Sequence, residues 1–232
     1  LWHIEQNNPR VVSSNDDMQG SYLGPEYSQK QIEEQLSKAG AKFKTLDEED
    51  LIEKVATDIS KSEAIGWFQG RMEFGPRALG NRSILGDPRS EKMQKNLNLK
   101  VKYRESFRPF APSVLKENLS DWFDINVESP YMLMVAGINK NKIIEMNKEQ
   151  KKLFGIEKLN VKRSEVPAIT HVDYSARIQT VKKETNERYF KLIKKFNEKT
   201  DCPLVINTSF NVRGEPIVNT PLDAFNCFMG TD

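Results

Sequence analysis

The spacing of hydrophobic and polar residues predicts a chain in which helices alternate with strands. In the first helical segment, apolar residues recur at Ile32, Leu36 and Ala39, which is the spacing of one helix face, and Ser28 stands at the N-cap position. Similar patterns predict the remaining helices. They are expected over residues 47–61, from Asp87-Pro88 with Met93 and Leu97 buried, over residues 189–199, and from Thr220 onwards.

Short apolar runs between these helices predict strands. Residues 64–68 and 204–206 are expected to form buried strands, and residues 171–179 alternate polar with apolar side chains, as a half-buried strand does. The lysine-rich residues 139–163 predict a solvated helical insertion, and the polar residues 1–27 predict a linker or arm. This alternation of elements indicates a mixed α/β fold.

The composition is that of a soluble globular protein. Of the 232 residues, 38% are hydrophobic and 29% are charged, and the formal net charge is only +2. Such a small net charge argues against general binding to nucleic acid or to membranes. The positive charge is nevertheless concentrated, because residues 69–112 hold ten Lys and Arg against four Asp and Glu.

The cysteine content predicts the cellular compartment, and the two chain ends predict that the chain is a fragment. Cys202 and Cys227 are too few for a disulfide framework and match no zinc pattern, which indicates a reducing cytoplasm. We find no apolar run of membrane-spanning length and no signal-peptide pattern. Because the chain starts at Leu1 and stops within an apolar helical pattern, we expect both ends to be cut.

The first segment with candidate chemistry is residues 70–83, which combine three glycines with Arg71, Arg77 and Arg82. Glycines let a backbone approach an anion closely, and guanidinium groups bind phosphate oxygens in pairs. The glycine spacing resembles a P-loop, but Pro76-Arg77 stands where the Lys-Ser/Thr pair belongs, so we reject a Walker ATPase. A plain glycine-rich turn, with arginines paired to acids such as Glu73, remains the alternative.

The second segment is residues 102–112. Lys102, Arg104 and Arg108 are evenly spaced and would share one face of an extended chain, which two prolines stiffen. Such a row of cations is suited to a polyphosphate or an adenylate. The alternative is a basic edge strand that discourages pairing between sheets.

The third segment is the alternating strand of residues 171–179. Its polar face includes His171 and Arg177, so it could line a pocket or simply face solvent. Because His3 is the one other histidine, no histidine-based metal site can be assembled.

The fourth segment follows the strand of residues 204–206 and contains Asn207, Ser209 and Asn211. Amides and hydroxyls at the carboxyl end of a strand can bind a nucleotide without adding charge. A capped turn is the alternative, since Asn, Ser and Gly favour turns for local reasons.

Together these segments resemble the carboxyl-terminal region of the O-carbamoyltransferases that take part in nodulation and antibiotic tailoring. The matching phrases are GSYLGPEYS, GRMEFGPRALGNRSIL, KYRESFRPFAPSVL, HVDYSARIQTV and PLVINTSFNVRGEPIV. The resemblance implies a YrdC-like domain over residues 28–232, an open twisted mixed α/β sheet flanked by helices with a basic cavity. Residues 1–27 would be an arm from a missing amino-terminal domain of the actin-like ATPase type.

The resemblance also implies the reaction. ATP, arriving with Mg²⁺, and carbamoyl phosphate would form carbamoyl adenylate in this domain, and the missing domain, which would carry the transfer metal, would pass the carbamoyl group to a hydroxyl acceptor. Lys102-x-Arg104 and Ser209-x-Asn211 are similar to the Lys-x-Arg and Ser-x-Asn motifs of YrdC proteins. We expect Lys102, Arg108 and Arg77 to be catalytic. The expected binding residues are Arg71, Arg82, Arg104, His171, Arg177, Asn207, Ser209 and Asn211.

Two other functions fit the same residues. A YrdC-like RNA-binding module would use the arginines on a nucleic-acid backbone, although the small net charge makes nucleic acid a poor expectation. A domain that binds nucleotide without turnover would need the same side chains as an enzyme. The acceptor, the oligomeric state and the role of residues 139–163 do not follow from the sequence.

Overall fold

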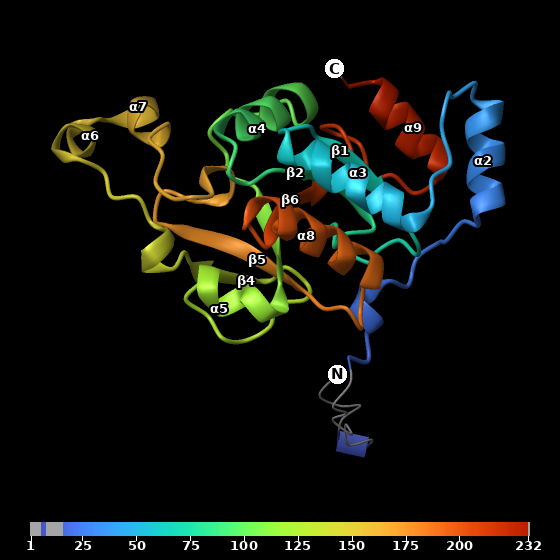
Figure 1. Ribbon diagram of the computed structural model, residues 1–232, viewed down its shortest axis with the longest axis horizontal. Helices are drawn as coiled ribbons and strands as arrows, with labels where there is room; N and C mark the ends of the chain where they lie inside the picture. Colours follow the sequence, from blue (N-terminus) through green and yellow to red (C-terminus); the bar gives the residue numbers. More distant parts are fainter. Residues whose placement is uncertain (1–5, 8–15, 232) are drawn as a thin grey trace.

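The protein is built around a six-stranded open sheet with the strand order β1-β2-β6-β3-β5-β4 (Figure 1). The computed structural model describes residues 6–7 and 16–231. Every neighbouring pair of strands is antiparallel except β3 and β5, which are parallel. The strands are β1 (Ile65–Phe68), β2 (Arg82–Gly86), β3 (Ala111–Leu115), β4 (Met134–Gly137), β5 (Ser175–Val181) and β6 (Leu204–Ser209).

Helices flank this sheet, so the expected α/β class with an open mixed sheet is confirmed. The α-helices are α2 (Gln29–Lys38), α3 (Glu48–Ser60), α4 (Glu91–Asn96), α5 (Leu119–Trp122), α6 (Lys148–Lys152), α7 (Gly155–Leu159), α8 (Glu187–Thr200) and α9 (Pro221–Met229). Short turns of helix are η1 (Gln19–Ser21), η2 (Leu97–Val101), η3 (Lys116–Asn118), η4 (Lys140–Lys142) and η5 (Pro167–Ile169). The specific likeness to YrdC proteins stays a prediction.

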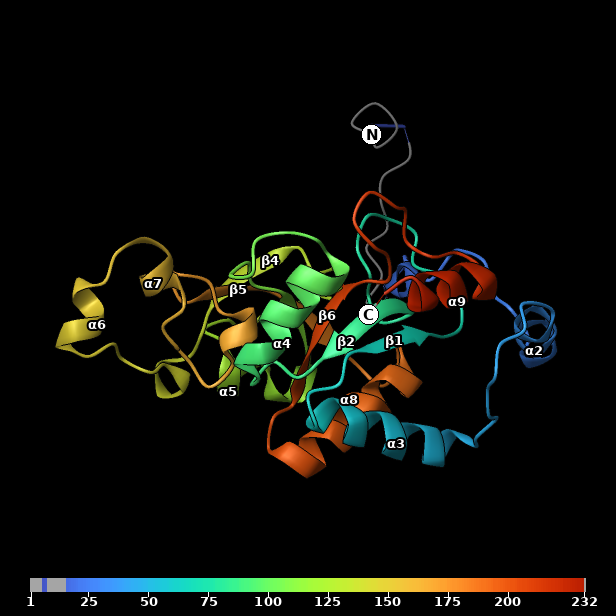
Figure 2. The same ribbon diagram turned by 90° about the horizontal axis from the view of Figure 1, so that it is seen from above.

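The main layer of the core lies between the sheet and the pair α3 and α8. These two helices pack side by side on one side of the sheet, and α9 lies on the other side (Figure 2). The apolar stripe of α8, formed by Tyr189, Leu192, Ile193 and Phe196, is fully buried. Burying each such side chain contributes about 1.5–3 kcal/mol, so α8 anchors the sheet that carries the site.

The capping residues act as the sequence predicts. Ser28 closes a capping box with Gln31, Asp47 accepts a hydrogen bond from the Asp50 N–H, and Thr220 closes a capping box at α9. The expected helices over residues 28–40, 47–61, 189–199 and after Thr220 are therefore confirmed, with ends that shift by a residue or two.

Several local expectations are wrong. Asp87-Pro88 does not begin a helix, because the Asp87 carboxylate pairs with Arg89 at 2.7 Å and Ser90 caps α4 instead, although Met93 and Leu97 are buried as expected. The strand over residues 64–68 is an edge strand in which Trp67 is the one buried residue. In the fourth segment, β6 continues through Ser209, so Asn207 still belongs to the strand.

The basic segment after Lys102 is a loop rather than the stiff strand that its spacing suggested. Lys102 follows the π-helical turn η2, and Tyr103 has a left-handed backbone with φ of 44°. The Arg104 N–H donates to the Asn98 carbonyl at 3.0 Å, so the hydrogen bonds of this segment close turns instead of pairing with a strand. Residues 171–174 likewise form a turn, and the half-buried strand begins at Ser175.

The described part of the amino-terminal arm is docked onto the domain. The Met72 N–H donates to the Pro25 carbonyl, the Gly24 N–H donates to the Met72 carbonyl, and the Phe74 N–H donates to the Ser21 carbonyl. The arm therefore pairs with the glycine- and arginine-rich segment. Residues 1–5 and 8–15, which the same prediction covers, lie outside the described residues.

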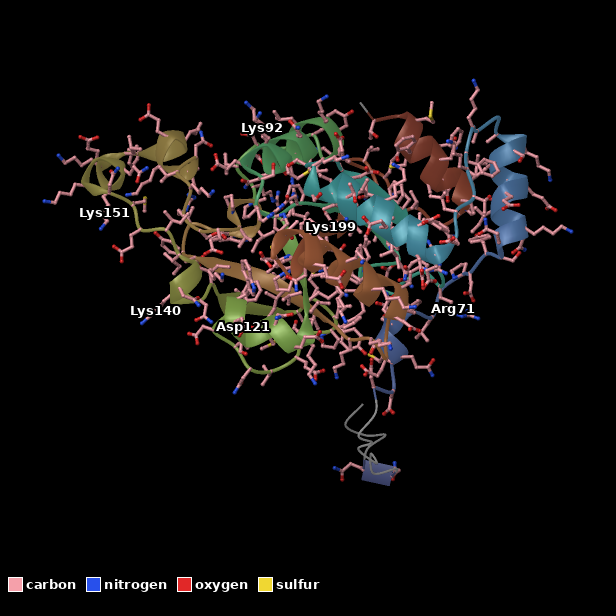
Figure 3. All side chains as sticks on the ribbon, viewed as in Figure 1. Arg71, Lys92, Asp121, Lys140, Lys151 and Lys199 are labelled. Carbon is pink, nitrogen blue, oxygen red and sulfur yellow. The ribbon has the colours of Figure 1, made fainter. Side chains whose placement is uncertain are left out.

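The lysine-rich insertion is solvated, as predicted. It forms α6 and α7 beyond a bridge between Ile143 and Ser164, and Lys151 projects from its far end (Figure 3). Within residues 6–7 and 16–231, no helix is both long and apolar enough to span a bilayer.

Candidate functional site

A cavity of about 470 Å³ opens where β6, β5 and the basic loop before β3 meet. It collects seven of the residues that the sequence predicts for binding or catalysis, and adds apolar walls. The lining residues are Pro76, Arg77, Ala78, Arg104, Arg108, Pro109, Phe110, Ala111, Met132, Val135, His171, Ser175, Arg177, Asn207, Thr208 and Ser209. This volume lies within the roughly 300–1,000 Å³ typical of small-molecule sites.

A second cavity of about 360 Å³ adjoins the first. Both are lined by Arg104, Arg108, Thr208 and Ser209, so the two form one continuous depression, called the basic depression below. The second cavity adds Lys102 and Asn211 to the lining, together with Glu105, Val212, Arg213 and Gly214. All predicted site residues except Arg71 and Arg82 thus line the basic depression.

Arg77 reaches the basic depression from a loop that a buried carboxylate holds in shape. Glu73 Oε1 accepts hydrogen bonds from the backbone N–H groups of Leu79 at 2.7 Å, Asn81 at 2.7 Å and Arg82 at 3.2 Å. Hydrogen bonds to a charged acceptor are stronger than neutral ones. Glu73 therefore fixes the loop rather than neutralising its arginines.

Arg104 and Arg108 are presented by a loop organised around Asn98, which is fully buried. The Asn98 Oδ1 accepts from Arg104 Nε at 2.5 Å, and its Nδ2 donates to the Arg108 carbonyl at 2.8 Å. The Arg104 guanidinium also lies 4.8 Å from the centre of the Phe110 ring. Asn98 thus sets the positions of both cations without lining either cavity.

Most of the positive charge of the basic depression is not neutralised by protein carboxylates, because Glu105 is the one carboxylate among the described lining residues. Within the described residues, Arg77, Arg104, Arg108 and Arg177 make no ion pair. Burial lowers the pKa of Arg104 and of Arg177, and the neighbouring guanidinium groups of Arg108 and Arg77 lower them further. Four close cations that make no ion pair favour binding of an anion.

Lys102 binds the backbone and side chains where the chain turns at the end of β6. Its ammonium donates to the Ser209 carbonyl at 2.7 Å, to the Asn211 carbonyl at 2.9 Å and to Asn211 Oδ1 at 2.7 Å. Burial, with a smaller contribution from Arg104, lowers the pKa of Lys102 to about 8. The Lys-x-Arg and Ser-x-Asn phrases therefore meet in space, and the lysine orients the serine and the asparagine.

Asn207 forms the floor of the first cavity within a buried amide network. Its Nδ2 donates to Gln179 Oε1 at 2.8 Å, Ser113 Oγ at 3.0 Å and the Ala78 carbonyl at 3.1 Å. Gln179 in turn donates to the Leu79 carbonyl at 2.8 Å. The network joins β6, β3 and β5 to the loop that carries Arg77, so the floor of the cavity is rigid.

His171 and Arg177 come from the turn before β5 and from β5 itself. The His171 N–H donates to the Ser175 carbonyl at 2.9 Å, and this closes the turn. Partial burial lowers the pKa of His171, Asp173 raises it, and Arg177 lowers it again, with a net decrease. The imidazole is therefore neutral at pH 7 and faces a cavity rich in guanidinium groups.

Arg71 and Arg82 lie outside the basic depression. The fully buried guanidinium of Arg82 donates to the carbonyls of Gln69, Asn81, Pro25 and Gly70 and stacks 3.6 Å from the centre of the Phe68 ring. Arg71 lies at the edge of the molecule, where it donates to the Gly24 carbonyl and approaches Glu26 at 3.7 Å (Figure 3). Both arginines tie the arm to the domain, and we propose a structural role for them.

Sequence reasoning missed several residues that shape the site. Asn98 lies between Leu97 and Leu99, but Asn96 and Lys100 flank these residues, so no local signal in the sequence marks Asn98 as buried. Thr208 lies between two predicted residues, while Met132 and Val135 carry no polar chemistry to draw attention. Within the described residues, no group of three His, Cys, Asp or Glu side chains is placed to hold a metal ion.

Comparison with known proteins tests the resemblance directly. Residues 56–232 match the family model described as the carbamoyltransferase C-terminus. The chain belongs to the carbamoyltransferase family. Relatives are an uncharacterized protein of Synechocystis, 56% identical over the whole chain, and nodulation protein NolNO of Sinorhizobium fredii, 38% identical over 93% of it.

A third relative is named for its activity. The 3'-hydroxymethylcephem-O-carbamoyltransferase of Amycolatopsis lactamdurans is 33% identical over 71% of the chain. The chain spans 38%, 29% and 27% of the lengths of these three relatives. The resemblance inferred from the motifs is therefore confirmed for the carboxyl-terminal type of domain.

Proposed function

We propose that this domain binds ATP and carbamoyl phosphate in the basic depression and forms carbamoyl adenylate. The carbamoyl group then passes to a hydroxyl acceptor in another part of the longer enzyme. The observation that carries the proposal is the set of five guanidinium groups, those of Arg77, Arg104, Arg108, Arg177 and Arg213, that line the depression without an ion pair among the described residues. Two substrates that together bear several phosphate groups supply the missing negative charge.

The reaction balances in two steps. Water first cleaves carbamoyl phosphate into carbamate and phosphate. A carbamate oxygen then attacks the α-phosphorus of ATP, the bond to the bridging β-phosphate oxygen breaks, and pyrophosphate leaves. Each step places charge on phosphate oxygens, so fixed cations in a partly enclosed site are the main catalytic resource.

The two cavities suggest how the substrates divide the space. Arg77, Arg177 and His171 line the first cavity only, and we assign them to carbamoyl phosphate. Lys102 and Asn211 line the second cavity only, and we assign them with Ser209 to the nucleotide. Arg104 and Arg108 line both, where they can hold the phosphates at the point of reaction.

The partners and the compartment belong to the same proposal. Mg²⁺ would arrive with ATP, and the metal of the transfer step would lie in the amino-terminal, actin-like part of the longer protein. Such a part is in keeping with the fraction of its relatives that the chain spans. Cys202 and Cys227 are free and buried, which supports the reducing cytoplasm as the working environment.

The test measures pyrophosphate release from ATP and Mg²⁺, with and without carbamoyl phosphate, for the wild type and for Arg77→Ala and Arg108→Ala. Loss of a phosphate contact made in the transition state costs about 2–4 kcal/mol, so each variant should be roughly 30- to 1,000-fold slower. Arg188→Ala is the matched control, because Arg188 pairs with Glu48 away from the depression. Rates within about threefold of the control in both arginine variants would contradict the assignment.

A further inference from the structure

His171 differs from the other residues that line the first cavity in its proton chemistry. The described lining consists of His171, four arginines, hydroxyl and amide side chains, and apolar residues. Arginine stays protonated in proteins, and neutral hydroxyls and amides are very weak bases. Near neutral pH, His171 is thus the one described lining side chain able to take up a proton.

The local structure leaves the imidazole available to a ligand. The turn is held by backbone hydrogen bonds, and Asp173 Oδ1 accepts from the Ser175 N–H at 3.1 Å and from the Ser175 hydroxyl at 2.7 Å. No hydrogen bond among the described residues engages the imidazole of His171. The nearby carboxylate is thus occupied by Ser175, while the imidazole remains unbound beside Arg177.

Burial keeps this imidazole unprotonated. Partial burial lowers the pKa of His171, Asp173 raises it by less, and Arg177 lowers it by less still. The other charged groups around the cavity are Arg77, Arg104 and Arg108, all cations. An anion bound to Arg177 would lie beside a neutral imidazole, which is the state that a general base requires.

We propose that His171 is the general base for the cleavage of carbamoyl phosphate, an assignment that rests on the proposed function. His171 takes a proton from water as the water oxygen bonds to the carbamoyl carbon. The bond between that carbon and the bridging oxygen breaks, and phosphate leaves with the electron pair, stabilised by the arginines. The product is carbamic acid, which loses its remaining proton to solvent, and the second step consumes the carbamate that results. The proton on His171 then returns to solvent or to phosphate.

Other proton acceptors are placed less well for this step. Glu105 lines only the second cavity, on the side assigned to the nucleotide. The ammonium of Lys102 is surrounded by oxygen atoms of Ser209 and Asn211, so it serves as a donor. The attack on ATP needs no base, because carbamate is already an anion. His171 is therefore needed in the first step alone.

The test supplies carbamate directly and bypasses that step. Pyrophosphate release is measured for the wild type and His171→Gln, once with carbamoyl phosphate and once with ammonium carbamate. General-base catalysis contributes about 10²–10⁴-fold, so His171→Gln should lose at least about 100-fold with carbamoyl phosphate and stay within about threefold with carbamate. Val172→Ala is the control for the turn, because Val172 is exposed and lines neither cavity.

Each outcome decides a separate point. If His171→Gln loses activity with both substrates, or with neither, the base assignment is wrong and the proposed function stands. A wild type that uses carbamoyl phosphate but rejects carbamate excludes carbamate as the intermediate and overturns the assignment as well. A wild type that uses neither overturns the proposed function itself.

Two further measurements separate a base from a residue that only holds the substrate. With carbamoyl phosphate, the wild-type rate should rise with pH through a midpoint below the usual imidazole value of 6.5, and this limb should vanish in His171→Gln. In ¹⁸O-labelled water, the released phosphate should carry no label, because the water oxygen joins carbon. Label in the phosphate would show attack at phosphorus and contradict the mechanism.

Discussion

Replacing Glu73 should reveal how strongly the Arg77 loop depends on one buried carboxylate. Glu73 is only 4% exposed, and its Oε1 accepts three backbone hydrogen bonds, two of them at 2.7 Å. Glu73→Ala removes the acceptor and leaves three N–H groups without it. Each hydrogen bond to a charged group contributes about 1.5–3 kcal/mol, but water can enter the space left behind, so we expect a total loss of about 3–5 kcal/mol.

The conservative variant Glu73→Gln should be less destabilised than Glu73→Ala. Glu73→Gln keeps one oxygen acceptor but loses the charge, and places an NH₂ group near the position of Oε2, which is buried without a partner among the described residues. We expect Glu73→Gln to cost about 1–2 kcal/mol. Glu63→Ala is the control, because Glu63 is exposed and should change stability by less than about 0.5 kcal/mol.

Urea unfolding followed by tryptophan fluorescence measures these differences. Trp67 and Trp122 are both buried in the core, so their emission reports on global unfolding. The midpoint should fall in the order wild type, Glu73→Gln, Glu73→Ala, at an unchanged dependence on urea. A Glu73→Ala protein within about 1 kcal/mol of the Glu63→Ala control would refute the idea that the carboxylate holds this loop.

Three other predictions follow from the described contacts. Gly80 has a φ of +105°, and a Cβ there would lie 2.3 Å from Tyr189 Cδ1, so Gly80→Ala should lower the free energy of unfolding by about 3 kcal/mol or more. Gly40→Ala is the control and should cost about 1 kcal/mol, because its Cβ would meet no atom within 4 Å. Thermal unfolding compares the two variants, and equal losses would contradict the packing argument. Tyr22→Phe removes the hydroxyl that donates to the Leu79 carbonyl and accepts from Asn186, so urea unfolding should show a loss of about 1–2 kcal/mol, and no loss would mean that the arm docks without it. The pKa of Lys102 is lowered to about 8 from its usual 10.5, so its ammonium is lost above about pH 8 and adenylate formation should fall there. Between these two pH values the unfolded state binds more protons, so the contribution of Lys102 to folding stability should rise with pH. A wild-type rate that is flat from pH 7 to about 9.5 would contradict the role of the ammonium.

The helices were predictable because their signals are local. Ser28, Asp47 and Thr220 act as caps, and the stripe of α8 is buried as its spacing requires. These features depend on residues within three or four positions of one another. The same reasoning failed at Asp87, because its carboxylate had a competing partner two residues away in Arg89. Spacing alone does not reveal which of two local hydrogen bonds is formed.

The site was predictable in its members but not in its geometry. The arginine- and glycine-rich segments identified Arg77, Arg104 and Arg108, but the same reasoning also predicted Arg82 as a binding residue. Its burial depends on the Pro25 carbonyl of the arm and on the Phe68 ring of the neighbouring strand, which are contacts between segments separated in the sequence. Likewise, the even spacing after Lys102 suggested a strand, whereas η2 and Asn98 turn the segment into a loop. Long-range partners of this kind have no periodic signal in the sequence.

The most direct test of the central claim is pyrophosphate release from ATP and Mg²⁺, measured with and without carbamoyl phosphate on the wild type and Arg108→Ala. We predict release that requires carbamoyl phosphate and falls roughly 30- to 1,000-fold in the variant. Release that ignores carbamoyl phosphate, or that Arg108→Ala leaves unchanged, would contradict adenylate formation in the basic depression.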